Sequence, residues 1–344
     1  MEIKKYEIEM LDVKSADAFI IHIIDEKDED HIILVDAGDY TDGQKIIDHL
    51  RRYYKSPKIN LAIVTHPDDD HYGGFFYLLE KIKEKSKDAI EIKSFWIHDP
   101  GQHISAKDVK YGWTEERAKA EACSVLELNG QNLLKLIGDL KINKIEPFAY
   151  SGEDFTFGHP DYNLIVLGPS EEYYKSLVPS FRNGLKPKYK AEEIDEDSTV
   201  TLKDGKIYSK TLDEAGDDPS THNQSSLIFA FVPTEGKKYL FMGDAGEAAF
   251  KNIPKEFESY IKNVSWLKVP HHGSKYNLTN DMINTIKPKV AYISTEKIGN
   301  YLSQSVVNAL KKANCSVYST HKNRASYLHN QIEDRKDYST AETL

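Results

Sequence analysis

The feature that most constrains the fold is a run of histidines and aspartates directly after a short β-branched segment. Residues 63–65 read Ile-Val-Thr, and residues 66–74 continue as His-Pro-Asp-Asp-Asp-His-Tyr-Gly-Gly. β-branched residues favour a strand, and two glycines followed by an apolar run favour a turn into a helix. We therefore predict a strand, a tight ligand-bearing loop and a helix. The carboxyl end of such a strand is where α/β proteins usually place their functional sites.

Imidazole and carboxylate groups at this spacing favour a transition-metal site. His66, Asp68, Asp70 and His71 follow one another closely, and such donors suit zinc, manganese or iron. Alternate side chains of the loop could face one ion, and the last two could face a second ion. The alternative is a solvated acidic loop with two unrelated histidines, which the position at a strand end disfavours.

The composition is that of an ordinary globular chain with a sizeable core. Of 344 residues, 40% are hydrophobic and 29% are charged, which suffices for one large domain or two small ones. Two cysteines are too few for a disulfide framework, so we expect a reducing, cytoplasmic location. We find no signal peptide and no apolar run that could cross a bilayer, and expect no membrane association. The net charge of −10 argues against a broad DNA-binding surface.

Further potential ligands adjoin other predicted strands: His222 before residues 226–232, Asp244 after residues 238–242, and His271 and His272 after residues 266–269. Each alone is a weak signal, because an aspartate after a glycine is usually a turn and a lone histidine is usually structural. Metal sites draw ligands from several strand ends of one sheet, so the joint pattern predicts convergence. Asp36, after the predicted strand 31–35, could orient a ligand or simply form a turn.

Several other segments carry local predictions. Residues 4–10 alternate charged and apolar side chains, as in a half-buried strand, and residues 115–137 have the spacing of a helical hairpin or one long helix. The latter could form a wall or lid of the site, or a peripheral packing element. Residues 199–210 contain an Asp-Gly hairpin signal. Residues 212–218 are acidic, and we expect them to be exposed.

Together these motifs resemble the metallo-β-lactamase superfamily, and most of all the metallo-β-lactamase-like domain of the ComEC-type DNA-uptake competence protein and its free-standing relatives. The matching segments are residues 11–13 and 17–18 (Leu-Asp-Val, Asp-Ala), 33–38 (Ile-Leu-Val-Asp-Ala-Gly), 66–74, 241–245 (Phe-Met-Gly-Asp-Ala) and 268–274 (Lys-Val-Pro-His-His-Gly-Ser). The resemblance implies an α/β (α+β) fold, a four-layer αββα sandwich of two mixed sheets with helices outside. We expect one such domain over residues 1–334, insertions near 98–150 and 171–220, and a flexible tail at 335–344.

The resemblance also implies site roles: His66, Asp68 and His222 at one divalent ion, Asp70, His71 and His272 at a second, Asp244 between the ions, and His271 beside them in contact with a substrate oxygen. Zinc is the first expectation and manganese the alternative. Asp70 and His271 are the expected catalytic residues, because either could move protons.

Two departures from the resemblance matter. The superfamily usually reads His-x-His-x-Asp-His, and here Asp68 stands in place of the second histidine, which shifts the preference toward harder ions such as manganese. Competence-type domains often carry a Tyr-Gly-His-Pro-like loop where residues 298–302 read Ile-Gly-Asn-Tyr-Leu. A substrate contact by that histidine is therefore not expected.

The implied function is metal-dependent hydrolysis. Two ions sharing Asp244 would lower the pKa of a water between them, and the resulting hydroxide would attack phosphorus or a carbonyl carbon. A phosphodiesterase or nuclease is the first interpretation, with single-stranded nucleic acid or a nucleotide as substrate. A hydrolase of a small ester, lactone or thioester is the alternative. A third reading is a metal-binding scaffold or sensor with little turnover, for which a protein partner is left open. A nuclease predicts a basic, aromatic-lined groove, and a small-ester hydrolase predicts an enclosed apolar pocket.

Overall fold

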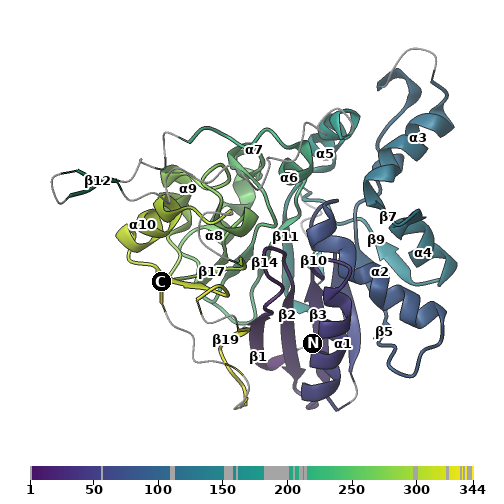
Figure 1. Cartoon of the computed structure of the whole chain (residues 1–344), viewed down its shortest axis with the longest axis horizontal. Helices are drawn as coiled ribbons and strands as arrows, with labels where there is room; N and C mark the ends of the chain where they lie inside the picture. Colours follow the sequence, from purple (N-terminus) through teal and green to yellow (C-terminus); the bar gives the residue numbers. More distant parts are fainter. Residues whose placement is uncertain are drawn as a thin grey trace.

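The strands of the chain pair into two large mixed sheets in the computed structural model (Figure 1). The structure describes residues 2–344 except 56, 109–112, 151–157, 160–161, 182–200, 204–205, 209–211, 213–214, 297–300, 323–324, 334, 336–337 and 339–342. The first sheet has the order β19 (Tyr327–His329), β1 (Ile3–Met10), β2 (Phe19–Asp25), β3 (Asp30–Val35), β4 (Lys58–Ile63), β6 (Ser94–Trp96) and β9 (Asn143–Ile145), with β5 (Glu91–Ile92) beside β4. The second has the order β10 (Gly158–His159), β11 (Leu164–Gly168), β14 (Ile228–Phe231), β15 (Tyr239–Phe241), β16 (Trp266–Lys268), β17 (Val290–Ile293) and β18 (Ser316–Ser319).

Helices cover the outer faces of both sheets. The α-helices of the described residues are α1 (Asp42–Tyr53), α2 (Asp69–Lys83), α3 (Glu115–Cys123), α4 (Leu133–Asp139), α5 (Glu171–Leu177), α6 (Thr221–Gln224), α7 (Glu247–Lys251), α8 (Glu258–Ile261), α9 (Asn280–Ile286) and α10 (Gln304–Lys312). In Figure 1, α9 and α10 lie on one side of the strands, and α1 and α2 lie on the other. None of the described helices is both long and apolar enough to cross a bilayer.

Alternate residues of β3 point to two different cores, as strand geometry requires. Ile33 and Val35 pack in the core that contains Phe229 of the second sheet. Ile32 and Leu34 pack instead in the core that contains the apolar faces of α1 and α2. The first sheet is therefore covered by a sheet on one face and by helices on the other. This arrangement confirms the predicted four-layer αββα sandwich.

Two helix predictions need correction. The helix after the ligand-bearing segment, α2, begins at Asp69, so Asp70 and His71 belong to its first turn rather than to a loop. Negative charge in a first helical turn is stabilised by the helix dipole, which explains the early start. Residues 115–137 form neither one helix nor a helical hairpin. A β-hairpin, β7 (Glu127–Leu128) and β8 (Gln131–Asn132), separates α3 from α4.

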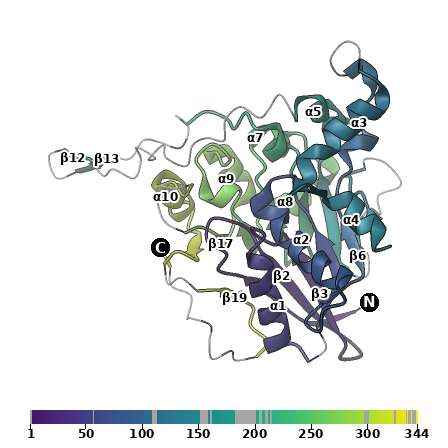
Figure 2. The same ribbon diagram turned by 45° about the vertical axis from the view of Figure 1, so that its right-hand side comes forward.

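The cause of that separation is the dipeptide Asn129-Gly130. Both residues adopt positive φ, at 51° and 75°, which is the turn that Asn-Gly favours between paired strands. The apolar spacing of residues 115–137 predicts a helix, but the Asn-Gly turn determines the structure in the middle of this segment. Both Figure 1 and Figure 2 show α3 at the edge of the molecule. The hairpin predicted in residues 199–210 is confirmed, since β12 (Thr201–Lys203) and β13 (Lys206–Tyr208) pair with each other.

Charged residues expected at the surface are buried in two places. Glu7 and Glu9 on β1 are 1% and 0% exposed, because the guanidinium of Arg335 pairs with both carboxylates at 2.5 Å. Asp218 is only 4% exposed, so the expectation of an exposed segment at 212–218 is wrong there.

In the terminal segment 335–344, the described residues Arg335 and Tyr338 contact Glu9. The division into one domain with two insertions and a flexible tail stays a prediction.

Candidate metal centre

Four histidine side chains point toward one carboxylate oxygen, Oδ2 of Asp244. The distance from this oxygen to Nε2 is 3.9 Å for His66, 3.4 Å for His71, 3.8 Å for His271 and 3.9 Å for His272. All of these side chains except that of His271, which is 18% exposed, lie at 3% exposure or less. Three segments that are far apart in the sequence, residues 66–71, 244 and 271–272, therefore meet at one buried point.

Three of these histidines are oriented in the same way. Their Nδ1 atoms lie near hydrogen-bonding oxygens: Thr65 Oγ1 at 3.1 Å from His66, Asp36 Oδ2 at 2.8 Å from His71, and the Ser294 carbonyl at 2.9 Å from His272. Their Nε2 atoms are buried and have no hydrogen-bond partner among the described residues. A buried polar atom without a partner is costly. A metal-binding histidine usually has a hydrogen bond at one ring nitrogen and leaves the other nitrogen for the metal. These residues therefore fit a divalent cation.

Negative charge around the cluster also fits a cation. Burial lowers the pKa of His272, but the carboxylates of Asp17, Asp70 and Asp244 outweigh burial and raise it to about 10. Burial would raise the pKa of Asp244, but the surrounding histidines and Lys268 hold it well below its usual range. Charge of this density favours a bound cation.

Asp68 and His222 form a second part of the cluster. Oδ1 of Asp68 lies 2.8 Å from Nδ1 of His222, and its Oδ2 lies 3.6 Å from Nε2 of His66. His222 stands in α6, and its Nε2 donates to the carbonyl of Phe181 at 3.0 Å. His222 therefore presents Nδ1 to the cluster, whereas the other histidines present Nε2.

The structure brings all of the predicted site residues together. Two of the groups whose donor atoms lie within 4.8 Å of one another consist of predicted site residues, namely His66 with His71 and Asp244, and Asp70 with His71 and His272. The two groups share His71. The sequence prediction assigned His66 and His71 to different ions that share Asp244, and both histidines lie beside Asp244 in the structure.

Two residues without a predicted role lie beneath the cluster. Lys268 is buried, contacts the Asp17 carboxylate, and lies 2.7 Å from the Gly243 carbonyl and 3.2 Å from Asp244 Oδ1. Burial lowers the pKa of Lys268, but the carboxylates of Asp17 and Asp244 raise it by more. Asp17 also lies 3.5 Å from Nδ1 of His272. A lysine at the end of a largely apolar strand is the sequence feature that could have indicated this buried cation.

The two adjacent histidines reach the same site through an unusual turn, η9 (His271–Gly273). Their φ angles are 45° and 52°, and that of Gly273 is 85°. Left-handed backbone is costly for residues with a Cβ and persists where the surroundings enforce it. A Cβ on Gly273 would be strained by the left-handed backbone and would lie 2.6 Å from Leu302 Cδ1, which would have to move.

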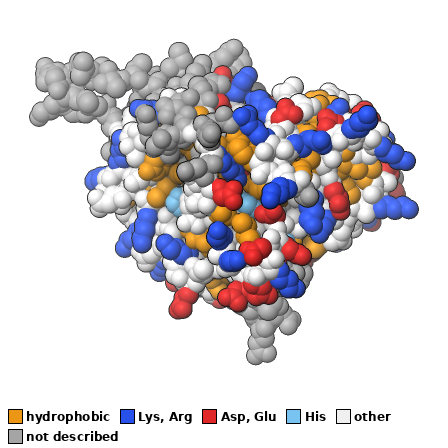
Figure 3. Space-filling model, turned by 90° about the horizontal axis from the view of Figure 1, so that it is seen from below, with side chains coloured by type: hydrophobic (Ala, Val, Ile, Leu, Met, Phe, Trp, Pro, Cys, Tyr) orange, Lys and Arg blue, Asp and Glu red, His pale blue; other side chains and the backbone are white. Residues whose placement is uncertain are grey.

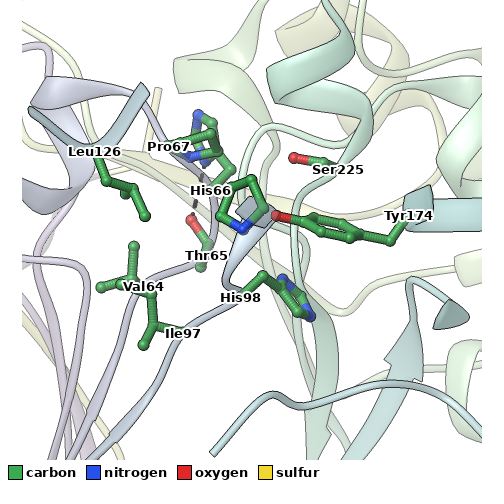
Figure 4. A pocket seen from close by; sticks show the side chains of 10 residues that line it. Val64, Thr65, His66, Pro67, Ile97, His98, Leu126, Tyr174 and Ser225 are labelled. Atoms are coloured by element: carbon green, nitrogen blue, oxygen red, sulfur yellow. Dashed lines mark hydrogen bonds between the residues drawn. The ribbon is translucent and has the colours of Figure 1, made fainter. Parts of the chain in front are cut away.

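A small pocket lies beside His66 (Figure 4). Its apolar wall includes Val64, Ile97 and Leu126, and the hydroxyl of Tyr174 points toward His66 from the opposite side. Leu126 and Tyr174 come from the segments predicted as insertions, so both segments supply a wall of the site. His98, also in the lining, is buried, and burial lowers its pKa to about 4.

Comparisons with known proteins agree with the predicted family. Residues 13–162 match the family model of the metallo-beta-lactamase superfamily. ComE operon protein 3 of Bacillus subtilis (strain 168) is 29% identical over 134 residues, which cover 38% of this chain and 17% of that protein.

Among solved structures, the metallo hydrolase Igni18 from the archaeon Ignicoccus hospitalis is 10% identical with a TM-score of 0.40, covering 95% of this chain and 100% of the other. A long form RNase Z from yeast is 12% identical with a TM-score of 0.37, covering 86% and 38%. The match over residues 13–162 and the similarity to ComE operon protein 3 confirm the predicted resemblance to the metallo-β-lactamase superfamily.

Proposed function

We propose that this protein is a metal-dependent phosphodiesterase with a dinuclear centre, acting on single-stranded nucleic acid or nucleotides. The observation that carries the proposal is the convergence of four imidazole Nε2 atoms on Oδ2 of Asp244, three of them buried without a hydrogen-bond partner among the described residues. Such a set of donors is suited to bind cations.

In this proposal the ligands are shared between two ions: His66, Asp68 and His222 at one, Asp70, His71 and His272 at the other, and Asp244 at both. Zinc is the first expectation, and Asp68 favours manganese as the alternative. When bound, divalent ions stabilise developing negative charge and lower the pKa of water. Asp70 and His271 have side chains 26% and 18% exposed, so an incoming substrate can reach them, and either can carry a proton.

The choice of a phosphodiester rests on the resemblance to DNA-uptake competence proteins and on charge. Lys275 directly follows the His-His-Gly-Ser motif and supplies a cation for phosphate near the cluster. On the face seen in Figure 3, Lys and Arg side chains are interspersed with Asp and Glu rather than gathered in one stripe. Together with the net charge of −10, this favours short or single-stranded substrates over long duplexes.

Metal analysis combined with a substrate panel tests the proposal. The purified or reconstituted protein should contain up to two equivalents of zinc or manganese. It should hydrolyse bis-(p-nitrophenyl) phosphate and single-stranded DNA, lose this activity on chelation, and regain it when metal is restored. A protein without metal after reconstitution, or one that hydrolyses only a lactone, contradicts the proposal.

A further inference from the structure

Asp218 is a buried carboxylate whose contacts lead directly to His271. Its Oδ2 accepts hydrogen bonds from Nδ2 of Asn223 and Nδ2 of Asn277, both at 2.7 Å. Its Oδ1 accepts the backbone N–H of Ser220 at 2.8 Å. Asp218 therefore joins the segment before α6 to the loop after the His-His motif.

The Asn277 amide fixes the tautomer of His271. Nδ2 of Asn277 donates to Asp218 and, at 2.8 Å, to the Asp244 carbonyl. Its Oδ1, 2.8 Å from Nδ1 of His271, can then only accept, so His271 carries a hydrogen on Nδ1. Asn223 Nδ2 lies 3.3 Å from the same nitrogen but already donates to Asp218. Asp218 Oδ2 itself lies 3.5 Å from this Nδ1, so its negative charge further stabilises the hydrogen on Nδ1.

His271 differs from the other three histidines of the cluster in its access to solvent. Its side chain is 18% exposed, whereas those of His66, His71 and His272 are 0% exposed. With Nδ1 held from behind, its Nε2 faces the cluster, 3.8 Å from Asp244 Oδ2. His271 is thus the histidine that a substrate oxygen can approach.

We propose that Asp218 is a positioning residue that, through Asn277, fixes the Nδ1–H tautomer of His271 and turns Nε2 toward the leaving oxygen of the substrate. This inference rests on the proposed phosphodiesterase function. A water oxygen forms a new bond to phosphorus, and the bond from phosphorus to the leaving oxygen breaks with its electron pair on that oxygen. The leaving oxygen takes a proton from Nε2 of the His271 imidazolium, which leaves the ring as the Nδ1–H tautomer that Asn277 holds. The proton that the water loses returns to Nε2 and restores the imidazolium.

Leaving-group dependence tests the role of Asp218. In Asp218→Asn, hydrolysis of a thymidine dinucleotide, whose alkoxide must be protonated, should fall about 10²-fold or more. Hydrolysis of bis-(p-nitrophenyl) phosphate, whose phenolate leaves without a proton, should fall less than about threefold. His271→Ala should show the same split, and Asp217→Asn, an exposed neighbour, should show neither loss. Equal losses of Asp218→Asn on both substrates would overturn the inference.

Nitrogen NMR of the histidine side chains separates this inference from the proposed function. The His271 signals, assigned by their absence in His271→Ala, should show a hydrogen on Nδ1 in the wild type and lose that preference in Asp218→Asn. Wild-type protein that hydrolyses neither phosphodiester contradicts the proposed function, while the NMR result still decides whether Asp218 positions His271. A wild-type His271 with its hydrogen on Nε2 alone, or an unchanged tautomer in Asp218→Asn, overturns the inference.

Discussion

The two halves of the cluster are supported by different kinds of groups. In the core half (Asp70, His71 and His272), Asp36 lies 2.8 Å from Nδ1 of His71, and Asp17 lies near Nδ1 of both histidines, at 3.8 and 3.5 Å. In the rim half (His66, Asp68 and His222), the supports are the neutral Thr65 hydroxyl and Phe181 carbonyl. The histidines of the core half therefore have buried carboxylates behind them in addition to the Ser294 carbonyl. The histidines of the rim half contact a hydroxyl and a peptide carbonyl, and the Asp36 carboxylate reaches His66 only through Thr65.

This difference bears on how firmly each half binds a metal. A carboxylate behind a histidine raises the basicity of the ligand more than a neutral acceptor does. The side chains of Asp68 and His222 are also 36% and 11% exposed, whereas His71 and His272 are 0% exposed. We expect the core half to retain its ion longer than the rim half during dialysis against a chelator.

Replacing Asp244 should have the largest effect, because both halves share it. Asp244→Ala should bind less than half of the wild-type metal and lose activity by about 10³-fold or more. Elemental analysis and the phosphodiesterase assay measure both quantities, with the exposed Asp281→Ala as control. Normal metal content in Asp244→Ala would show that the halves are independent sites.

Asp70→Ala should abolish turnover without unfolding the protein, since Asp70 stands in the first turn of α2 and the core lies elsewhere. The expected loss is about 10³-fold. Its neighbour provides the matched control, and Asp69→Ala should keep near-normal activity. Robust turnover by Asp70→Ala, measured at equal circular dichroism, would contradict a dinuclear mechanism.

The adjacent histidines should separate metal binding from substrate contact. His271→Ala should lower turnover of the thymidine dinucleotide by about 10²–10³-fold with nearly intact metal content. His272→Ala should lose the ion of the core half, because His272 is fully buried there. Equal metal loss in the two variants would refute this division of labour.

Replacing a supporting carboxylate should have a smaller effect, stronger on the core half than on the rim half, which Asp36 reaches only through Thr65. Asp36→Asn removes the charge behind His71 and should weaken binding of one ion by about 10–100-fold. Metal titration by calorimetry should resolve one strongly weakened binding step and one that changes less. Equal weakening of both steps would mean that Asp36 does not support the core half preferentially.

The smallest expected effect lies far from the metals, at Glu9. Burial raises the pKa of Glu9, but the hydrogen bond and charge of His49 and the charge of Arg335 outweigh burial and lower it to about 2. A pKa lowered on folding stabilises the protein above the unfolded value of 4.5, and this stabilisation is lost as the pH falls toward 2. Thermal unfolding between these pH values should be less pH-dependent in Glu9→Gln than in the wild type. The same pH dependence of thermal unfolding in Glu9→Gln and in the wild type would contradict the lowered pKa of Glu9.

Much of the fold and the identity of the cluster could be predicted from the sequence. Strand ends carry a readable signal, because largely apolar runs stop shortly before His66, Asp244 and His272. The four-layer arrangement followed from the resemblance. These predictions depend on local pattern, which a sequence contains directly.

The remaining features depend on contacts between distant segments. Asp218 looks like part of an exposed acidic stretch until Asn277, 59 residues later, is seen to bind it. Glu7 and Glu9 look solvated until Arg335 is placed against them. The Phe181 carbonyl determines which nitrogen His222 presents to the cluster. The spacing of residues in a sequence does not predict a contact with a backbone carbonyl.

The most direct test of the central claim is anomalous diffraction from crystals of the zinc- or manganese-loaded protein. Two anomalous peaks should flank Asp244, each about 2.0–2.2 Å from one of its carboxylate oxygens. One peak should adjoin His71 and His272, and the other should adjoin His66 and Asp68. An absence of peaks at Asp244, or metal bound only elsewhere on the chain, would contradict the claim that this carboxylate organises a dinuclear centre.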